Sequence, residues 1–233
     1  STSEGIFTNE YIENAIESIA PALKRKESFH VIDVVSTVMP GSCDSQFKPL
    51  LEKMSGKVCG VDFGLVYNPE FIALGSIIID FLNPDMVLIG ASDKRSSEMT
   101  KEIYLSTCEN KPVIKVMSII NAEITKLSLN CFVTMRISFA NELASICEKL
   151  PGADIDIITD ALGSDTRIGS KYLKGGLGFG GPCFPRDNQA FQWFAKESGV
   201  EPRLGPQVVA INNSVVDRLF DIIIKNTNPV DKI

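Results

Sequence analysis

A cysteine and an aspartate stand at the end of the glycine-rich segment 174–187, which reads KGGLGFGGPCFPRD. Glycines let backbone N–H groups approach a ligand closely, and they also permit a loop to close over one. We expect Cys183 to be more exposed than Cys131 or Cys147, so that it could act as a nucleophile. Asp187 could orient a water or a proton donor beside it. The alternative is a flexible surface turn with an incidental thiol.

A polar stripe is expected on an otherwise apolar helix, because Lys126, Asn130, Thr134 and Ser138 recur at every fourth position. A lysine and an asparagine placed in this way could hold a developing oxyanion together, one by charge and the other by an amide donor. A solvated helix face is the ordinary interpretation of such a stripe. The single charge, on Lys126, favours a buried polar role.

Polar residues follow two strand-like segments directly. The segment 36–41 (STVMPG) comes after the apolar run 30–35, and Glu70 comes shortly after the run 63–67. Ligands of α/β sheets bind at the carboxyl ends of parallel strands, so both segments are expected at the rim of one site. His30 lies at the opposite end of its strand, and we expect a structural role for it.

The segment 176–181 (GLGFGG) formally matches the dinucleotide-binding pattern G-x-G-x-x-G. That fingerprint requires a buried strand before it and a helix that opens at its end. Here the preceding segment 167–174 is basic, and Pro182 and Pro185 follow where the helix should start. We therefore interpret the match as coincidental.

The hydrophobic pattern predicts an α/β part followed by an all-α part, joined near residue 119. The first part alternates strands and helices in the manner of a doubly wound parallel sheet. The second part begins with one helix of about 30 residues, which corresponds to about 45 Å. We expect strands at 30–35, 63–67, 86–89 and 112–117, and helices at 9–24, 44–54, 98–108, 121–150, 155–162, 188–198 and 206–225.

The composition is that of an ordinary globular protein. The 233 residues have a net charge of −6 and 44% hydrophobic residues, which favours neither nucleic acid nor a membrane surface as partner. Six scattered cysteines and a single histidine speak against a zinc site. Residues 1–10 do not resemble a signal peptide, and no apolar run is long enough to span a membrane. We expect mostly buried free thiols and a cytoplasmic location.

Five segments of the sequence carry a further signal, and they read STVMPG, YNPEFIALGSIIIDFLNPDMVLIG, AEITKLSLN, FANELASICEKLPGADIDII and RIGSKYLKGGLGFGGPCFPRD. Together they resemble the UDP-glucose/GDP-mannose dehydrogenase family. They occur in the family's order between Ser36 and Gly199, and the last is highly specific.

The resemblance implies an NAD-dependent, four-electron oxidation of a nucleotide-sugar alcohol to a uronic acid. Cys183 resembles the family's nucleophile, which captures the aldehyde as a thiohemiacetal that is then oxidised to a thioester. The other implied catalytic residues are Lys126 and Asn130 for the oxyanion, Asp187 for water and protons, Glu70 as acid/base in thioester hydrolysis, and Thr37 for positioning a water.

Binding residues are implied in the same way. Those on the nicotinamide side are Ser36, Thr37 and Val38. Those implied to contact the substrate are Glu70, Phe71, Ile72, Ala73, Leu74, Lys126, Asn130, Arg167, Tyr172, Lys174, Gly178, Phe179 and Gly180. In the family, Arg167 often reaches the site of a neighbouring subunit.

The sequence departs from the family pattern in three respects. Leu74 stands where many members have a second glutamate, which puts the hydrolysis step or the substrate choice in doubt, and Arg186 replaces a common lysine. The family's first strand with its G-x-G-x-x-G turn and its third, nucleotide-binding domain have no counterpart. The expected domains are therefore a partial NAD-binding domain (1–118), a helical dimerisation domain (119–225) and the start of a linker (226–233).

Two alternatives remain open at this stage. The chain could be an inactive dimerisation module, since a long helix with an apolar face is suited to form a homodimer. It could also be a dehydrogenase similar to those of 3-hydroxyisobutyrate or 6-phosphogluconate. Those enzymes also place a lysine and an asparagine on a central helix, but they have no counterpart of the Cys183 segment.

Overall fold

The computed structural model describes residues 6–73 and 75–227. The chain divides into two compact units, Ser1–Lys126 and Leu127–Ile233. Helix α5 (Ile119–Cys147) begins in the first unit and continues into the second. Leu74 and residues 228–233, which include most of the expected linker, lie outside the described residues.

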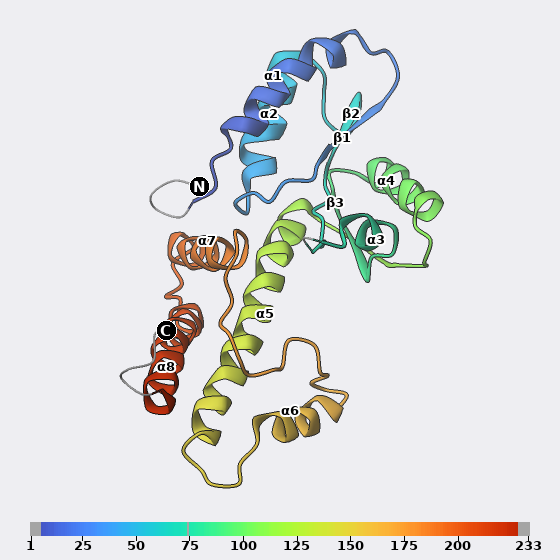
Figure 1. Cartoon of the computed structure of the whole chain (residues 1–233). Helices are drawn as coiled ribbons and strands as arrows, with labels where there is room; N and C mark the ends of the chain where they lie inside the picture. The colour runs from blue at the N-terminus through green and yellow to red at the C-terminus, as the bar shows by residue number, and fades with distance from the viewer. Residues whose placement is uncertain (1–5, 74, 228–233) are drawn as a thin grey trace. The chain divides into compact units, whose positions relative to one another are not determined.

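The first unit alternates strands and helices, as predicted from the hydrophobic pattern (Figure 1). Its expected strands are all present within one or two residues of their predicted bounds. Its elements are α1 (Glu10–Arg25), β1 (His30–Val34), the π-helical turn η1 (Cys43–Phe47), α2 (Lys48–Ser55), β2 (Phe63–Tyr67), α3 (Ile77–Leu82), β3 (Met86–Ala91), α4 (Lys94–Thr107) and β4 (Val113–Met117).

The four strands form one sheet in the order β1-β2-β3-β4. Strands β1 and β2 pair in parallel, as do β3 and β4, but β2 and β3 pair antiparallel through Val66–Ala91 and Tyr67–Gly90. The α/β class is thus confirmed, whereas the expectation of a wholly parallel sheet is wrong at its centre. A short apolar run shows that a strand is buried but does not show its direction.

Strand β2 is buried along its whole length because both faces of the sheet are covered. Its alternate residues Phe63, Leu65 and Tyr67 pack into a cluster with residues of α1 and α2. Val66 points to the other face and packs with Tyr104 of α4. Gly64 permits the close approach of α4, since a Cβ there would lie 1.6 Å from the Ser96 hydroxyl oxygen.

The second unit is all-α, as predicted. It consists of the larger part of α5 and of α6 (Ile155–Ser164), α7 (Phe184–Glu197) and α8 (Leu204–Asn226). Helix α3 and the π-helical turn before α2 were not predicted from the sequence. In the two described stretches, no helix combines the length and the apolar character needed to cross a membrane.

Candidate active site

The pairing of β1 and β2 brings two of the expected site segments to one edge of the sheet. Val34 is the register partner of Tyr67, and the N–H of Asn68 donates to the carbonyl of Val34 at 3.0 Å. The segments after the two strands therefore start side by side. After β1, Ser36 is exposed, Thr37 is half-buried and Val38 is buried.

Lys126 is anchored on the segment after β2. Its ammonium Nζ donates a short hydrogen bond to the backbone carbonyl of Glu70 and lies 4.6 Å from the centroid of the Phe71 ring. The Lys126 residue is only 9% exposed. Of the other residues expected to contact substrate here, Ile72 and Ala73 are exposed, and Leu74 lies outside the described residues.

The Glu70 carboxyl group is half-buried and lies in a small pocket that is also lined by Asn68 and Tyr104. Burial raises the pKa of Glu70, and the positive charge of Lys126 acts in the opposite direction. Neither Asn68 nor Tyr104 was among the site residues expected from the sequence. Asn68 could have been found from its place at the strand end before Glu70, but Tyr104 is far away in the sequence and has no local signal.

The polar stripe on α5 is not a solvated face. Thr134 and Ser138 are both buried. The Thr134 hydroxyl accepts from Nδ2 of Asn188 at 2.9 Å, and the Ser138 hydroxyl donates to the carbonyl of Val208 at 2.8 Å. The ordinary interpretation of such a stripe is therefore wrong here, and these hydroxyls join α5 to α7 and α8.

Asn130 and Asp187 are in direct contact within the second unit. Nδ2 of Asn130 donates to Oδ2 of Asp187 at 2.6 Å, and Asp187 is only 1% exposed. The guanidinium of Arg186 lies 3.3 Å from Oδ1 of the same carboxylate. Buried charge is costly unless it is paired and hydrogen-bonded, and this carboxylate has both kinds of partner.

Cys183 is exposed and is the residue directly before α7. Its carbonyl accepts from the N–H of Asp187 at 2.8 Å, so that the thiol and the buried carboxylate belong to the same helical turn.

Two asparagines fix the glycine-rich segment from neighbouring helices. Asn141 of α5 accepts from the N–H of Gly176 at 2.9 Å. Asn212 of α8 accepts from the N–H of Phe179 at 2.6 Å and donates to the carbonyl of the same residue at 3.0 Å. A Cβ on Gly178 would lie 2.5 Å from Oδ1 of Asn212. The segment is therefore held by its backbone, and sequence reasoning missed both asparagines.

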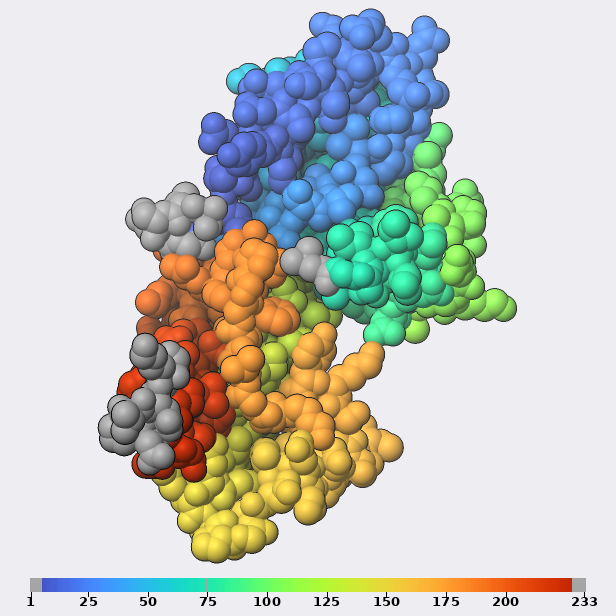
Figure 2. All heavy atoms as spheres, in the orientation of Figure 1, coloured from blue at the N-terminus to red at the C-terminus, as the bar shows by residue number. Residues whose placement is uncertain are grey.

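The G-x-G-x-x-G match at 176–181 lies in this irregular segment, and no strand directly precedes it. Gly178 and Gly180 are exposed, whereas Phe179 is buried. The orange atoms of this part of the chain lie at the surface of the second unit in Figure 2. The strand that a dinucleotide-binding turn requires before its glycines is therefore not found next to this match.

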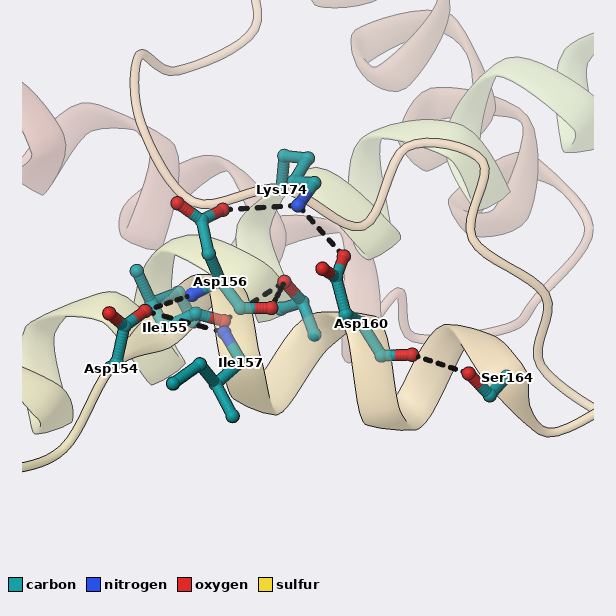
Figure 3. A network of polar contacts seen from close by, with 8 residues as sticks. Asp154, Ile155, Asp156, Ile157, Asp160, Ser164 and Lys174 are labelled. Atoms are coloured by element: carbon teal, nitrogen blue, oxygen red, sulfur yellow. Dashed lines mark hydrogen bonds and ion pairs between the residues drawn. The ribbon is translucent and has the colours of Figure 1, made fainter.

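The remaining residues expected to contact substrate are exposed. The Lys174 ammonium lies 3.1 Å from Asp156 and 2.9 Å from Asp160, both on α6, and Figure 3 shows it between these two carboxylates. Arg167 pairs with Asp165 at 2.6 Å. Tyr172 is exposed and has a positive φ of 61°.

All six cysteines are free, but the expectation of mostly buried thiols is only partly correct. Cys43 is buried and Cys183 is exposed. The other four, Cys59, Cys108, Cys131 and Cys147, are half-buried. Among the described residues, no group of three or more His, Cys, Asp or Glu side chains is placed to hold a metal ion.

The segment after β1 fits one end of a dinucleotide. Ser36 and Thr37 offer hydroxyls at the carboxyl end of a strand in a parallel pair, where α/β sheets bind cofactors. The amides that follow do not fit a pyrophosphate, because the N–H groups of Gly41 and Cys43 donate to the buried carboxylate of Glu123 at 2.6 and 3.0 Å. After β1 the chain thus offers hydroxyl groups at Ser36 and Thr37, whereas the amides of Gly41 and Cys43 are already engaged.

Comparisons with known proteins agree with this arrangement. Residues 2–108 match the NAD binding domain of the UDP-glucose/GDP-mannose dehydrogenase family, and residues 120–214 match its central domain. The chain is 37% identical to the UDP-glucose 6-dehydrogenase AglM of Haloferax volcanii, over 96% of this chain and 52% of that protein. It is 35% identical to the GDP-mannose 6-dehydrogenase of Pseudomonas aeruginosa, over 91% and 48%.

A solved structure, that of a UDP-glucose dehydrogenase from the archaeon Pyrobaculum islandicum, superimposes with a TM-score of 0.86. It has 32% identity and covers 96% of this chain and 50% of its own. The chain thus spans about half the length of the relatives that it matches. From two successive domain matches and the shared fold, the chain belongs to the UDP-glucose/GDP-mannose dehydrogenase family.

Proposed function

We propose that this chain carries the NAD-binding and catalytic groups of a nucleotide-sugar 6-dehydrogenase. The reaction converts the primary alcohol of a nucleotide sugar to a carboxylate in two oxidation steps through a covalent intermediate on Cys183. The relatives named UDP-glucose and GDP-mannose 6-dehydrogenase support this class of substrate. The two expected domains then have distinct roles, one for the cofactor and one for the covalent chemistry.

The proposed nucleophile is the thiolate of Cys183. It adds to the carbonyl carbon of the aldehyde, and a new C–S bond forms while the carbonyl oxygen becomes an oxyanion. Asn130 and Lys126 are one turn apart on α5 and donate to this oxyanion. After the second oxidation, water adds to the thioester and the C–S bond breaks, so that the thiolate returns to Cys183. Glu70 and Asp187 exchange the protons of these steps.

NAD supplies a hydride acceptor for each of the two oxidations when it is bound. We place its nicotinamide end at Ser36, Thr37 and Val38, the segment with exposed and half-buried hydroxyls after β1. Thr37 also positions the hydrolytic water. The substrate contacts proposed from the sequence bind the sugar and its phosphates. They are the residues from Glu70 to Ala73, Arg167, Tyr172, Lys174 and the segment Gly178–Gly180.

One observation carries the proposal furthest: an exposed thiol at a helix N-terminus is followed one turn later by a buried carboxylate. Dehydrogenases similar to those of 3-hydroxyisobutyrate and 6-phosphogluconate do not need a thiol. The hydrogen bond from Asn130 to Asp187 connects the oxyanion-holding helix to the turn that contains Cys183. This arrangement is suited to thioester chemistry.

The test is turnover of the protein that contains this chain, with Cys183→Ser compared with Cys147→Ser. Cys147 is half-buried on α5 and has no role in the proposal, so its variant serves as a matched control. We expect Cys183→Ser to reduce complete oxidation of UDP-glucose or GDP-mannose at least about a thousandfold. Cys147→Ser should retain activity within a few-fold. Full turnover by Cys183→Ser would contradict the thiol mechanism.

We also propose that the protein forms a homodimer through α5. Phe132, Phe139 and Ile146 recur at intervals of two helical turns and are all exposed. A regular apolar stripe on a long helix is suited to pack against a second copy of itself. Light scattering should show a dimer that Phe139→Glu converts to a monomer, and a wild-type monomer at high concentration would contradict the proposal.

A further inference from the structure

Glu70 shares its pocket with a tyrosine whose single proton is already engaged. Tyr104 Oη lies 2.6 Å from Oδ1 of Asn68 and 3.2 Å from Oε1 of Glu70. Asn68 and Tyr104 are both buried. A phenol has one proton to donate and lone pairs with which to accept, so the direction of these two contacts decides how Tyr104 acts on Glu70.

The orientation of Asn68 determines that direction. Its Nδ2 donates to the carbonyl of Leu88 at 2.8 Å, and a carbonyl can only accept. The amide oxygen of Asn68 therefore faces Tyr104, and this oxygen can accept but not donate. The phenolic proton belongs to the short contact with Asn68. What Tyr104 presents to Glu70 is then an oxygen lone pair.

We propose that Asn68 and Tyr104 are positioning residues that hold Glu70 as a neutral carboxylic acid, whose proton is donated to the Tyr104 oxygen. A carboxylate at the same place would face that lone pair without a proton between the two oxygens. For catalysis, Glu70 would start the reaction cycle as a proton donor and would act as a base only after it has released this proton. This consequence for the mechanism rests on the proposed function.

Other charged and titratable groups lie near Glu70 in the described part of the chain, and one of them, Asp80 of α3, lines the same pocket. Desolvation, and after it repulsion from Glu70, raises the pKa of Asp33 on β1 to about 7, which also favours keeping one proton in this region. Burial keeps the phenol of Tyr104 and the thiol of Cys108 protonated. Lys126 on α5 donates to the backbone carbonyl of Glu70, and its positive charge acts to lower the pKa of the Glu70 carboxyl.

The two possible directions of the Tyr104 contact predict opposite results for Tyr104→Phe. A hydroxyl that donated to Glu70 would stabilise the carboxylate, and its removal would raise the pKa of Glu70. In our account the hydroxyl stabilises the neutral acid. Tyr104→Phe should therefore lower the pKa of Glu70 by about 0.5 to 1, a three- to tenfold change in the protonation equilibrium.

The measurement is a carbon-13 NMR titration of the chain with labelled glutamate carboxyls, in which Glu70→Gln identifies the Glu70 signal. Tyr11→Phe is the matched control, because Tyr11 is 77% exposed on α1, and it should leave the Glu70 midpoint unchanged. A lower midpoint in Tyr104→Phe supports the proposal. An unchanged or higher midpoint overturns it.

A second variant keeps the test decisive if Tyr104→Phe does not fold. Asn68→Leu removes the acceptor of the phenolic proton, so that Tyr104 becomes free to donate to the Glu70 carboxylate. The midpoint of Glu70 should again fall, and an unchanged midpoint would contradict the role of Asn68. The titration needs neither cofactor nor substrate, so its outcome is distinguishable from a failure of the proposed function.

Discussion

Asn130 of α5 holds the Asp187 carboxylate of α7, with Nδ2 of Asn130 only 2.6 Å from Oδ2 of Asp187. The asparagine is half-buried and the aspartate is fully buried. Through this contact, a residue of α5 is tied to the first turn of α7, which begins directly after Cys183. Asn130, one of the two residues expected for oxyanion binding, is thus linked within the second unit to the helical turn that follows Cys183.

The first prediction concerns Asn130→Asp. Two carboxyl groups would then meet in a buried place. Repulsion between them would give one of them a higher pKa in the folded protein than in the unfolded protein. Because stability is lost as pH rises through such a raised pKa, the variant should be about 1–3 kcal/mol less stable than wild type at pH 7. The deficit should shrink near pH 4. Urea unfolding at both pH values measures it.

The control for this variant is Asn121→Asp, which makes the same change at an exposed position of α5. Its stability should stay within about 0.5 kcal/mol of wild type at either pH. Equal effects of the two variants would show that the contact with Asp187 is unimportant.

The second prediction compares two glycines of the same segment. Gly178→Ala places a Cβ 2.5 Å from the Asn212 oxygen that accepts from the N–H of Phe179, so the asparagine must move and this hydrogen bond is lost. We expect a loss of about 1–3 kcal/mol in the free energy of unfolding. Gly180→Ala meets nothing within 4 Å and should be nearly neutral. Thermal unfolding of both variants would show whether backbone fixation is the reason for glycine at 178.

The third prediction concerns the buried Glu123, which accepts from the N–H groups of Gly41 and Cys43. Glu123→Leu leaves both donors without a partner, and the expected loss of stability is about 2–4 kcal/mol. Glu142→Leu, at an exposed position of the same helix, should change stability by less than about 0.5 kcal/mol. Chemical denaturation of both variants tests the difference, and similar losses would contradict the account of Glu123.

The fourth prediction is a pH dependence that comes from Glu70. Burial raises its pKa, so the folded chain keeps this proton at pH values at which the unfolded chain has lost it. Stability from this group is complete below the ordinary pKa of a glutamate and is lost as pH rises through the raised pKa. Glu70→Gln removes this dependence. The free energy of unfolding of Glu70→Gln should therefore rise relative to that of wild type as the pH increases from 4.5 to 8. Glu102→Gln, at an exposed position, should show no such rise.

The sequence predicted most elements because their apolar patterns are strong. The runs at β1 and β2 and the regular spacing along α5 are unambiguous. The direction of β3 was not predictable, since pairing of Tyr67 with Gly90 depends on the path of the chain between them. Helix α3 was missed because the run Ile77–Ile79 has no helical spacing and its side chains are largely exposed.

For the candidate site, the sequence indicated residues within motifs and missed those that support them from a distance. Cys183, Asp187 and Glu70 stand in recognisable segments. Asn212 and Tyr104 act through contacts with residues 33 or 34 positions away, and no local pattern indicates such contacts. The burial of the Thr134 side of α5 also depends on helices later in the chain, which is why the stripe resembled a solvated face.

The most direct test of the proposed function is mass spectrometry of the protein containing this chain, with the Glu70→Gln variant incubated with NAD and UDP-glucose or GDP-mannose. Without the carboxyl that we expect to assist hydrolysis, the thioester should accumulate, and the sugar should be found covalently attached to the peptide that contains Cys183. The adduct should be absent from the double variant Glu70→Gln/Cys183→Ser. It should be present in the double variant Glu70→Gln/Cys147→Ser. A variant that turns over these substrates without any adduct on Cys183, or with the adduct on another cysteine, would contradict the account.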